Sequence, residues 1–390
     1  MAKSFKNKTY KLSGSLLLPG LTFFLALLIM AVLLVLPQDK LLAGKNQASA
    51  PPVELNSQVL LSLNKGESDR YYPYSDQYLL RLSNDLVTYL TLTGREEMSF
   101  PIQVNNLYMD QAGSYFLIGD LGGYNFYLFD QEGLQYYGRT DEPIEALSVS
   151  PTGASSFILN EATSKGIVRI LDEKGKHLLD WRIRDRLYSG YPLNMAFTPD
   201  GKFLDVSLIN TDGASLGPIY YQIDLEALQL SKAVYLDGDL LYPLLLAKDA
   251  NTAYLVSSSH VVKVEELKSN VLLEFSEIYD AVPGEKGLGI LGRQTEGDEK
   301  RFYYIPYVEG QTHPIEGNLQ AKEIGRDAYL LIKGHGKMAL ANPEGVYILD
   351  ENRSEALNFL SLKSPVQKMT FIKEDVLLVI MEDQVRLVRV

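Results

Sequence analysis

The sequence NMAFTPDGKFLDVSLINTDGASLGPIYYQIDLE, residues 194–226, contains the unit from which most of the chain is built. A short apolar strand (195–197) leads into the turn Thr198-Pro199-Asp200-Gly201, a second strand (203–209), a polar loop and a third strand (219–223). Proline presets the φ angle of such a turn, and glycine accepts its left-handed corner. The spacing therefore predicts consecutive antiparallel strands joined by short turns.

The same features recur along the chain. Short apolar runs alternate with Gly, Pro, Asp and Asn turns roughly every 8 to 12 residues, and no amphipathic run has helical length, which is typical of an all-β fold. The third strand of the unit ends on aspartate four times, at intervals of 42, 52 and 126 residues. A period near 42 with four short strands is typical of a β-propeller blade. The recurring positions are the turns Asp110-Gln111-Ala112-Gly113 and Ser150-Pro151-Thr152-Gly153, and the aspartates Asp130, Asp172, Asp224 and Asp350.

This repeat predicts an all-β fold, an eight-bladed β-propeller preceded by one N-terminal transmembrane helix. Seven blades are the alternative, because the sixth and seventh blades are irregular. The last blade has only three strands of its own (367–372, 376–380 and 385–390), and Gln58 to Leu63 can supply the fourth. Pairing the two ends closes the ring and removes exposed strand edges. The other predicted blades are 70–105, 106–144, 145–192, 193–241, 242–278, 279–326 and 327–366.

The N-terminal region predicts a membrane anchor. Leu16 to Leu36 contains no charged residue, and at about 1.5 Å per residue it reaches roughly 30 Å, the thickness of the hydrocarbon core. A cleaved signal peptide is the alternative, but its best cleavage site, Ala48-Ser49-Ala50, lies far downstream and precedes Pro51. Four lysines precede the span, so the positive-inside rule keeps the N-terminus in the cytoplasm. The predicted segments are a cytoplasmic N-terminus (1–14), a transmembrane signal anchor in contact with membrane lipid (15–37), a flexible tether (38–55) and an extracytoplasmic propeller at the cell membrane (56–390).

Composition excludes several classes of function. Residues 1–50 contain six lysines and one acidic residue, Asp39, and so carry a charge of +5. Because the whole chain has a net charge of −12, the remainder carries −17. So acidic a domain repels phosphate backbones, and we expect no nucleic-acid partner. The chain has no cysteine, which excludes disulfides, thiol catalysis and thiolate metal sites.

The turn signatures resemble WD40-like and pyrroloquinoline-quinone-type propeller repeats. An N-terminal anchor followed by such a domain resembles an uncharacterised family of membrane-anchored propeller proteins of Gram-positive bacteria. The resemblance implies a fold and a location, and it carries no catalytic residue. It departs from true WD40 repeats, since no Trp-Asp dipeptide occurs and Gly334-His335 is a single Gly-His pair.

Several short motifs match functional patterns only by their letters. Gly287 to Gly292 matches G-x-G-x-x-G, but no helix is expected after it, so we interpret it as a glycine-rich inner strand near the axis. Gly213 to Gly217 matches G-x-S-x-G, but a strand follows it, which predicts a loop. Asp237-Gly238-Asp239 lacks the remaining oxygen ligands of a calcium loop. We therefore predict no catalytic residue, cofactor or metal; the four histidines, without metal-like spacing, are His177, His260, His313 and His335.

Loop length indicates a binding surface. The longest predicted loops join second and third strands (160–166, 210–218 and 292–300) or consecutive blades (184–192, 237–243 and 279–287), and both classes emerge on one face. We predict a protein-interaction scaffold or sensor at the cell envelope, with a protein or envelope component bound there. The alternatives are a hydrolase or lyase at the mouth of the propeller channel, and structural adhesion to the cell wall. The predicted binding residues are Arg184, Arg186, Tyr188, Tyr191, Asp212, Asp239, Tyr242 and Tyr279.

Overall fold

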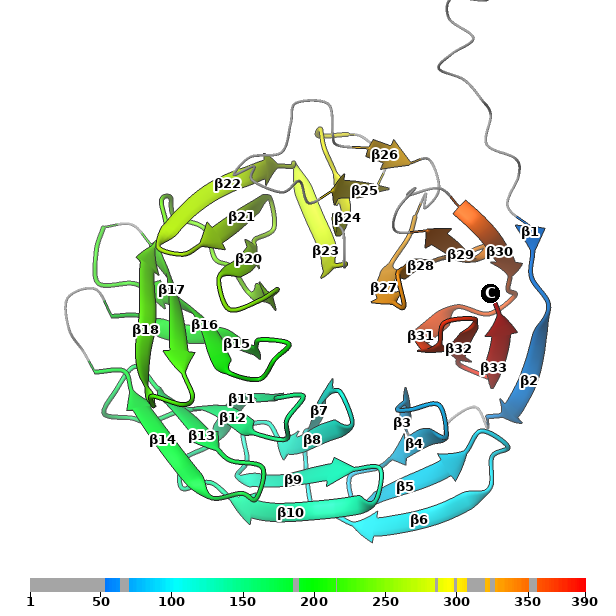
Figure 1. The fold of residues 1–390 in the computed structure, drawn as a ribbon, viewed down its shortest axis with the longest axis horizontal. Coiled ribbons are helices and arrows are strands. Elements are labelled where there is room, and N and C mark those ends of the chain that lie inside the picture. The colour runs from blue at the N-terminus through cyan, green and yellow to red at the C-terminus, as the bar shows by residue number, and fades with distance from the viewer. Residues whose placement is uncertain are drawn as a thin grey trace, which may run out of the picture. The chain divides into compact units, whose positions relative to one another are not determined.

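Eight sheets, each containing four antiparallel strands, surround a common axis (Figure 1). The computed structural model describes residues 53–63, 70–184, 189–214, 216–284, 287–297, 300–306, 320–322, 327–350 and 356–390. Each sheet is one blade of a β-propeller, so the eight-bladed prediction is confirmed and the seven-bladed alternative is wrong. The predicted cytoplasmic segment, anchor and most of the tether lie outside the described residues, and no helix within those residues has the length and apolar character needed to cross a membrane.

In each blade the first strand lies nearest the axis, and the later strands follow outward (Figure 1). The first four blades contain β3 (Arg70–Pro73), β4 (Tyr78–Leu82), β5 (Leu86–Thr91) and β6 (Glu96–Pro101); β7 (Leu107–Ala112), β8 (Tyr115–Asp120), β9 (Asn125–Asp130) and β10 (Gly133–Arg139); β11 (Ile144–Val149), β12 (Ser155–Leu159), β13 (Ile167–Leu171) and β14 (His177–Arg182); and β15 (Tyr191–Phe197), β16 (Phe203–Asn210), β17 (Gly217–Asp224) and β18 (Gln229–Tyr235).

The next three blades follow the same order, and their inner strands are β19, β23 and β27. They contain β19 (Leu244–Ala247), β20 (Thr252–Val256), β21 (His260–Glu265) and β22 (Lys268–Glu274); β23 (Glu277–Pro283), β24 (Gly287–Arg293), β25 (Arg301–Pro306) and β26 (Gln320–Lys322); and β27 (Leu330–Gly334), β28 (Lys337–Asn342), β29 (Gly345–Asp350) and β30 (Ala356–Ser361).

The eighth blade closes the ring with strands from both ends of the propeller. It contains β31 (Val366–Lys373), β32 (Val376–Met381), β33 (Gln384–Arg389) and, outermost, β2 (Ser57–Ser62). The outer pair runs antiparallel from Ser57 opposite Val388 to Ser62 opposite Gln384, and Arg386 Nη1 donates to Ser57 Oγ at 2.7 Å. The predicted closure is confirmed. A short strand that the sequence did not predict, β1 (Val53–Glu54), also pairs in parallel with β30 of blade 7.

Three of the four recurring aspartates stabilise the turn between the third and fourth strands of their blade, and the turn after the fourth, Asp350, lies outside the described residues. The Oδ1 atom of Asp224 accepts hydrogen bonds from the backbone N–H groups of Glu226 and Ala227, both at 2.9 Å. Asp130 and Asp172 make the equivalent contact with N–H groups two residues further on. Aspartate recurs because its short carboxylate satisfies turn N–H groups that the strand ladder leaves unpaired.

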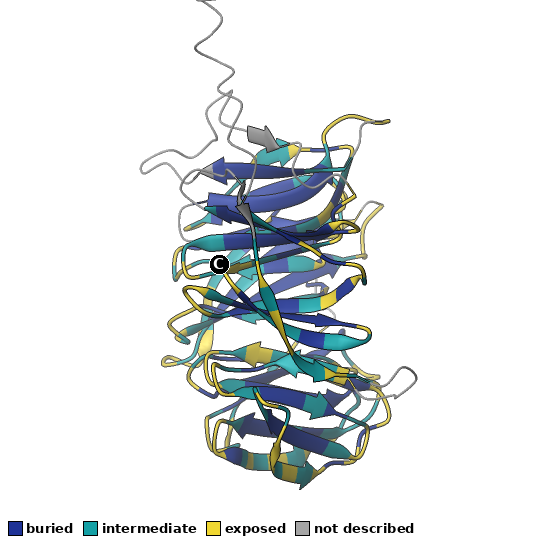
Figure 2. Ribbon diagram, turned by 90° about the vertical axis from the view of Figure 1, so that its right-hand side faces the viewer, coloured by how far each residue is buried: buried dark blue, intermediate teal, exposed yellow. Residues whose placement is uncertain are grey.

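The hydrophobic core consists of eight clusters, one between each pair of neighbouring blades. The cluster between blades 8 and 1 joins Leu378, Ile380 and Val385 to Leu79 and Leu90. Figure 2 shows the buried residues along the strands and the exposed residues mainly at the loops and edges. Since every blade is packed on both sides, the ring supports a rigid face.

Polar side chains connect neighbouring inner strands close to the axis. Asp110 on β7 accepts hydrogen bonds from the backbone N–H of Val149 at 2.8 Å and from Ser148 Oγ at 3.0 Å, both on β11. Asn194 on β15 donates to the carbonyl of Pro243, just before β19, at 2.8 Å. Asp280 on β23 similarly accepts from a backbone N–H on β27. These contacts fix the spacing of inner strands.

The glycine-rich segment 287–292 forms β24, as a strand was predicted, but β24 is the second strand of blade 6 and not the inner one. Gly289 allows close packing against blade 7, since a Cβ atom there would lie 2.9 Å from Met338 Sδ, whereas a Cβ atom at Gly287 or Gly292 would meet Tyr304 or the carbonyl of Glu277 within blade 6. Close packing of neighbouring strands, rather than position at the axis, explains the glycines.

Candidate interaction face

Two kinds of segment emerge at one end of the blades. They are the loops between second and third strands and the connections from each fourth strand to the next blade. Because successive strands of a blade run in opposite directions, both kinds lie at the same end. We call this end the loop-rich face; every inner strand begins there.

Lys165, in the loop between β12 and β13, links two of the predicted binding residues. Its side chain is buried, and Nζ donates to Asp212 Oδ2 at 2.6 Å and to the carbonyl of Ser189 at 3.2 Å. The same ammonium lies 5.7 Å from the ring centroid of Tyr191, within the range of a cation–π contact. One buried cation thus joins the loops of blades 3 and 4 and presents Asp212 and Tyr191, 46% exposed, at the surface.

Tyr279 stands in a second cluster, on blade 6. Its ring is 40% exposed and lies 4.1 Å from Lys300 Nζ and 5.6 Å from the guanidinium carbon of Arg293. Its hydroxyl donates to the carboxylate of Glu277, and this hydrogen bond raises the pKa of Tyr279. Both clusters therefore combine an exposed tyrosine at the start of an inner strand with a cation and a carboxylate.

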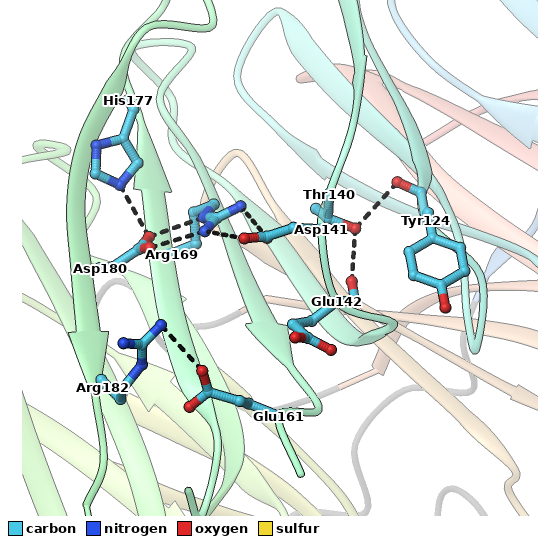
Figure 3. A network of polar contacts seen from close by, with 9 residues as sticks. All are labelled: Tyr124, Thr140, Asp141, Glu142, Glu161, Arg169, His177, Asp180 and Arg182. Atoms are coloured by element: carbon cyan, nitrogen blue, oxygen red, sulfur yellow. Dashed lines mark hydrogen bonds and ion pairs between the residues drawn. The ribbon is translucent and has the colours of Figure 1, made fainter. Parts of the chain in front are cut away.

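An ionic network supports the face at blade 3 (Figure 3). Arg169 on β13 contacts Asp141, in the connection from blade 2, at 2.5 Å and Asp180 on β14 at 2.7 Å. The hydrogen bonds from Arg169 lower the pKa of both aspartates. His177 Nε2 lies 2.9 Å from Asp180 Oδ1. The network joins the connection from blade 2 to the outer strands of blade 3.

Two further contacts in Figure 3 fix the loops beside this network. Arg182 at the end of β14 contacts Glu161, in the same loop as Lys165, at 3.0 Å. Thr140 Oγ1 lies 3.1 Å from the carbonyl of Tyr124 and 2.7 Å from that of Glu142, both of which can accept its hydrogen bond. The second-to-third-strand loops of blades 2 and 3, and the connection between these blades, are therefore held by side chains at several points.

The other predicted binding residues have different outcomes. Arg184 and Asp239 are exposed in connections on the loop-rich face, whereas Arg186 and Tyr188 lie outside the described residues. The prediction that Tyr242 is a binding residue is wrong, because its side chain is only 2% exposed and packs in the core between blades 4 and 5. The predicted connection 279–287 is also wrong, since residues 279–283 belong to the inner strand β23.

Sequence reasoning missed Lys165 and Lys300, the cations that contact Tyr191 and Tyr279. Each lies in a polar loop, where a lysine is normally solvated, and the buried state of Lys165 depends on a loop of another blade. Sequence reasoning also missed two exposed tyrosines at the loop-rich face: Tyr108, near the start of β7, and Tyr329, just before β27. Only the pattern of an exposed aromatic at the start of an inner strand could have indicated them.

The hydrolase or lyase alternative requires catalytic groups that converge near the axis. The described inner strands carry four carboxylates. Asp110 and Asp280 are held by backbone N–H groups of the next blade, and burial raises the pKa of both. Glu145 accepts a hydrogen bond from Asn160, and Glu277 contacts Tyr279 and Arg293. The described histidines lie elsewhere: His177 on β14, His260 on β21 and His335 in the turn after β27. This arrangement gives the enzymatic alternative no support.

Comparison with known proteins agrees with the fold. Residues 55–218 match a family of unknown function (DUF5711). BamB from Moraxella catarrhalis has a similar structure, with 13% identity, a TM-score of 0.52 and coverage of 85% of this chain and 97% of that one. A eukaryotic initiation factor is also similar, with 11% identity, a TM-score of 0.54 and coverage of 87% and 88%, respectively. No curated protein sequence matches the chain significantly.

Proposed function

We propose that the chain is a membrane-anchored scaffold or sensor whose propeller lies on the extracytoplasmic side and holds a protein partner against the loop-rich face. The observation that carries the proposal is the distribution of exposed apolar side chains. Large ones gather at this end of the blades, whereas the turns at the opposite end carry only Leu228 and Leu267 among the described residues. The remaining ones among the described residues lie on the outer strands β2, β10 and β22, and are Val59, Tyr137 and Val271. Those at the loop-rich end of the blades are Tyr108, Tyr191, Leu216, Tyr235, Leu241, Tyr279 and Tyr329.

Tyrosines fixed by neighbouring groups suit protein recognition. Tyrosine is enriched among the residues that contribute most to interface energy, because it buries a large ring and has few rotatable bonds. Tyr191 and Tyr279 already contact cations that hold their rings in place, so binding orders them at little further entropic cost. A stable interface buries about 1,600 Å² in total, so we expect the partner to contact the loops of several blades.

Charge favours a basic partner. The propeller region carries most of the negative charge of the chain, whose formal net charge is −12. An acidic surface accelerates association with a basic one and repels other acidic proteins. We therefore expect association to slow as salt increases, since exposed charges are screened over about 8 Å at physiological ionic strength.

The proposed location rests on the sequence. The uncharged segment 15–37 has the length of a single span, and the lysines that precede it favour a cytoplasmic N-terminus. Protease added outside intact cells whose wall is permeable to it should remove the propeller and spare the lysine-rich start. Survival of the propeller would reverse the proposed topology.

Site-specific photocrosslinking in the native membrane tests the interaction. A photoreactive phenylalanine analogue replaces Tyr191 or Tyr279 in the full chain, with Leu228 and Leu267 as matched positions at the opposite end. We expect one protein to be crosslinked from both tyrosine positions and from neither leucine position. Equal crosslinking from all four positions, or none from the tyrosines, contradicts the proposal.

A further inference from the structure

Two cations from neighbouring blades meet at the loop-rich end of the inner strands. Arg70 is the first residue of β3, and Lys368 is the third residue of β31. The Lys368 ammonium lies 2.8 Å from the ring centroid of Tyr72 on β3, so the side chain reaches from blade 8 across to blade 1. Arg70 Nη1 donates to the carbonyl of Leu107, at the start of β7, at 2.9 Å. Blades 8, 1 and 2 thus contribute to one site.

Neither cation forms an ion pair with a carboxylate of the described residues. Burial first, and then the positive charge of Arg70, lower the pKa of Lys368 to about 8. The carboxylate beside Tyr108 is used otherwise, because Asp110 Oδ2 accepts hydrogen bonds from the Val149 N–H at 2.8 Å and from Ser148 Oγ at 3.0 Å on β11. In a chain with such an acidic balance, two adjacent cations that lack a counter-charge among the described residues attract an external anion.

Two tyrosines complete the surroundings. Tyr72 lies under the ammonium, and Tyr108 is on the adjacent strand β7. Burial raises the pKa of Tyr108, and the neighbouring Asp110 and Tyr72 raise it further, so its hydroxyl stays protonated at neutral pH. Tyr108 remains 45% exposed, and its hydroxyl can donate a hydrogen bond to a ligand.

We propose that Arg70 and Lys368, with Tyr72 and Tyr108, form a binding site for a carboxylate at the loop-rich end of the inner strands of blades 8, 1 and 2. The planar guanidinium of arginine matches a carboxylate with two parallel hydrogen bonds, and the ammonium adds a point charge. The carboxylate belongs to a small organic acid or to an acidic peptide. This proposal does not require the protein partner that photocrosslinking tests, so either proposal can fail without the other.

The amine reactivity of Lys368 gives a direct test. With a pKa of about 8, the Lys368 amine is neutral in roughly half of the molecules at pH 8, and the neutral amine is the nucleophile. A bound carboxylate favours the charged form, and a rise of the pKa to about 9 leaves about one tenth neutral. Acetylation of Lys368, followed by mass spectrometry, should therefore slow roughly fivefold in glutarate at constant ionic strength. The exposed Lys363, in the connection before β31, is the internal reference and should not change.

Matched variants and ligands decide the outcome. Arg70→Met should abolish protection of Lys368 by glutarate, whereas Arg95→Met, at an exposed turn on the opposite end, should preserve it. If a tetraglutamate peptide protects Lys368 at a lower concentration than glutarate does, the ligand is a protein segment. If glutarate protects Lys368 at the lower concentration, the ligand is a small organic acid. The proposal is overturned if glutarate leaves Lys368 unprotected, slows Lys363 equally, or still protects in the folded Arg70→Met variant. Protection by inorganic phosphate but not by glutarate also overturns it.

Discussion

Replacing Asp205 with asparagine should change how the stability of the propeller depends on pH. Asp205 on β16 is fully buried, and its Oδ1 accepts a hydrogen bond from Gln222 Nε2 at 2.9 Å. Gln222 also donates to the carbonyl of Ala250 in blade 5, at 3.2 Å, so the group lies where blades 4 and 5 meet. Burial raises the pKa of Asp205 from 3.8 to about 7, which outweighs the opposing effect of the Gln222 hydrogen bond.

The sign follows from which state holds the proton. Between pH 4 and pH 7 the folded protein keeps Asp205 protonated, whereas the unfolded chain has released the proton. The free energy of unfolding therefore falls as pH rises through this window, by about 1.4 kcal/mol per pH unit, and the contribution levels off above pH 7. From pH 5 to pH 8 the loss is roughly 3 kcal/mol. For a domain of about 340 residues, with an unfolding entropy near 0.7 kcal/mol/K, this corresponds to about 4 °C in Tm.

Thermal unfolding of the propeller at pH 5, 6, 7 and 8 measures the effect. Asparagine keeps the shape of a protonated aspartate and cannot ionise. The difference in Tm between Asp205→Asn and the native protein should therefore change by about 4 °C, in favour of the variant, as the pH rises from 5 to 8. Asp237→Asn, at an exposed position, should follow the native curve. Parallel curves for Asp205→Asn and the native protein would refute the assignment of a buried, protonated carboxyl group.

Three further outcomes follow from the packing. Deleting Val385 to Val390 removes most of β33 and the partner of β2, so the whole ring should lose its protease resistance; a soluble, resistant product would contradict closure. Arg169→Met should cost roughly 1–2 kcal/mol in urea unfolding at pH 7. That cost should shrink at pH 3, because the pKa of Asp180 is lowered by Arg169 and its contribution is lost as pH falls. Lys165→Met should lower Tm because Asp212 and the Ser189 carbonyl lose a buried donor, whereas the exposed Lys174→Met should leave Tm unchanged.

Local sequence determined the repeated unit. The turn ending at Gly201 has φ +68° there, and Gly153 has φ +90°, as the turn pattern predicted. Asp224 binds the turn N–H groups two and three residues further on, so its role needs only neighbouring residues. Strand number and closure follow from the same local periodicity, because an incomplete last blade and an isolated first strand have one another as partners.

The candidate sites depended on residues far apart in the chain. Tyr242 and Tyr191 look alike in sequence, yet one is buried between blades 4 and 5 and the other is exposed beside a lysine of blade 3. Lys368 acquires its environment from Tyr72 and Arg70 only because the ring closes. Periodicity fixes the strands because turn and strand preferences act over a few residues, whereas burial and charge at the loop-rich face arise from contacts between blades, which only the closed tertiary structure decides.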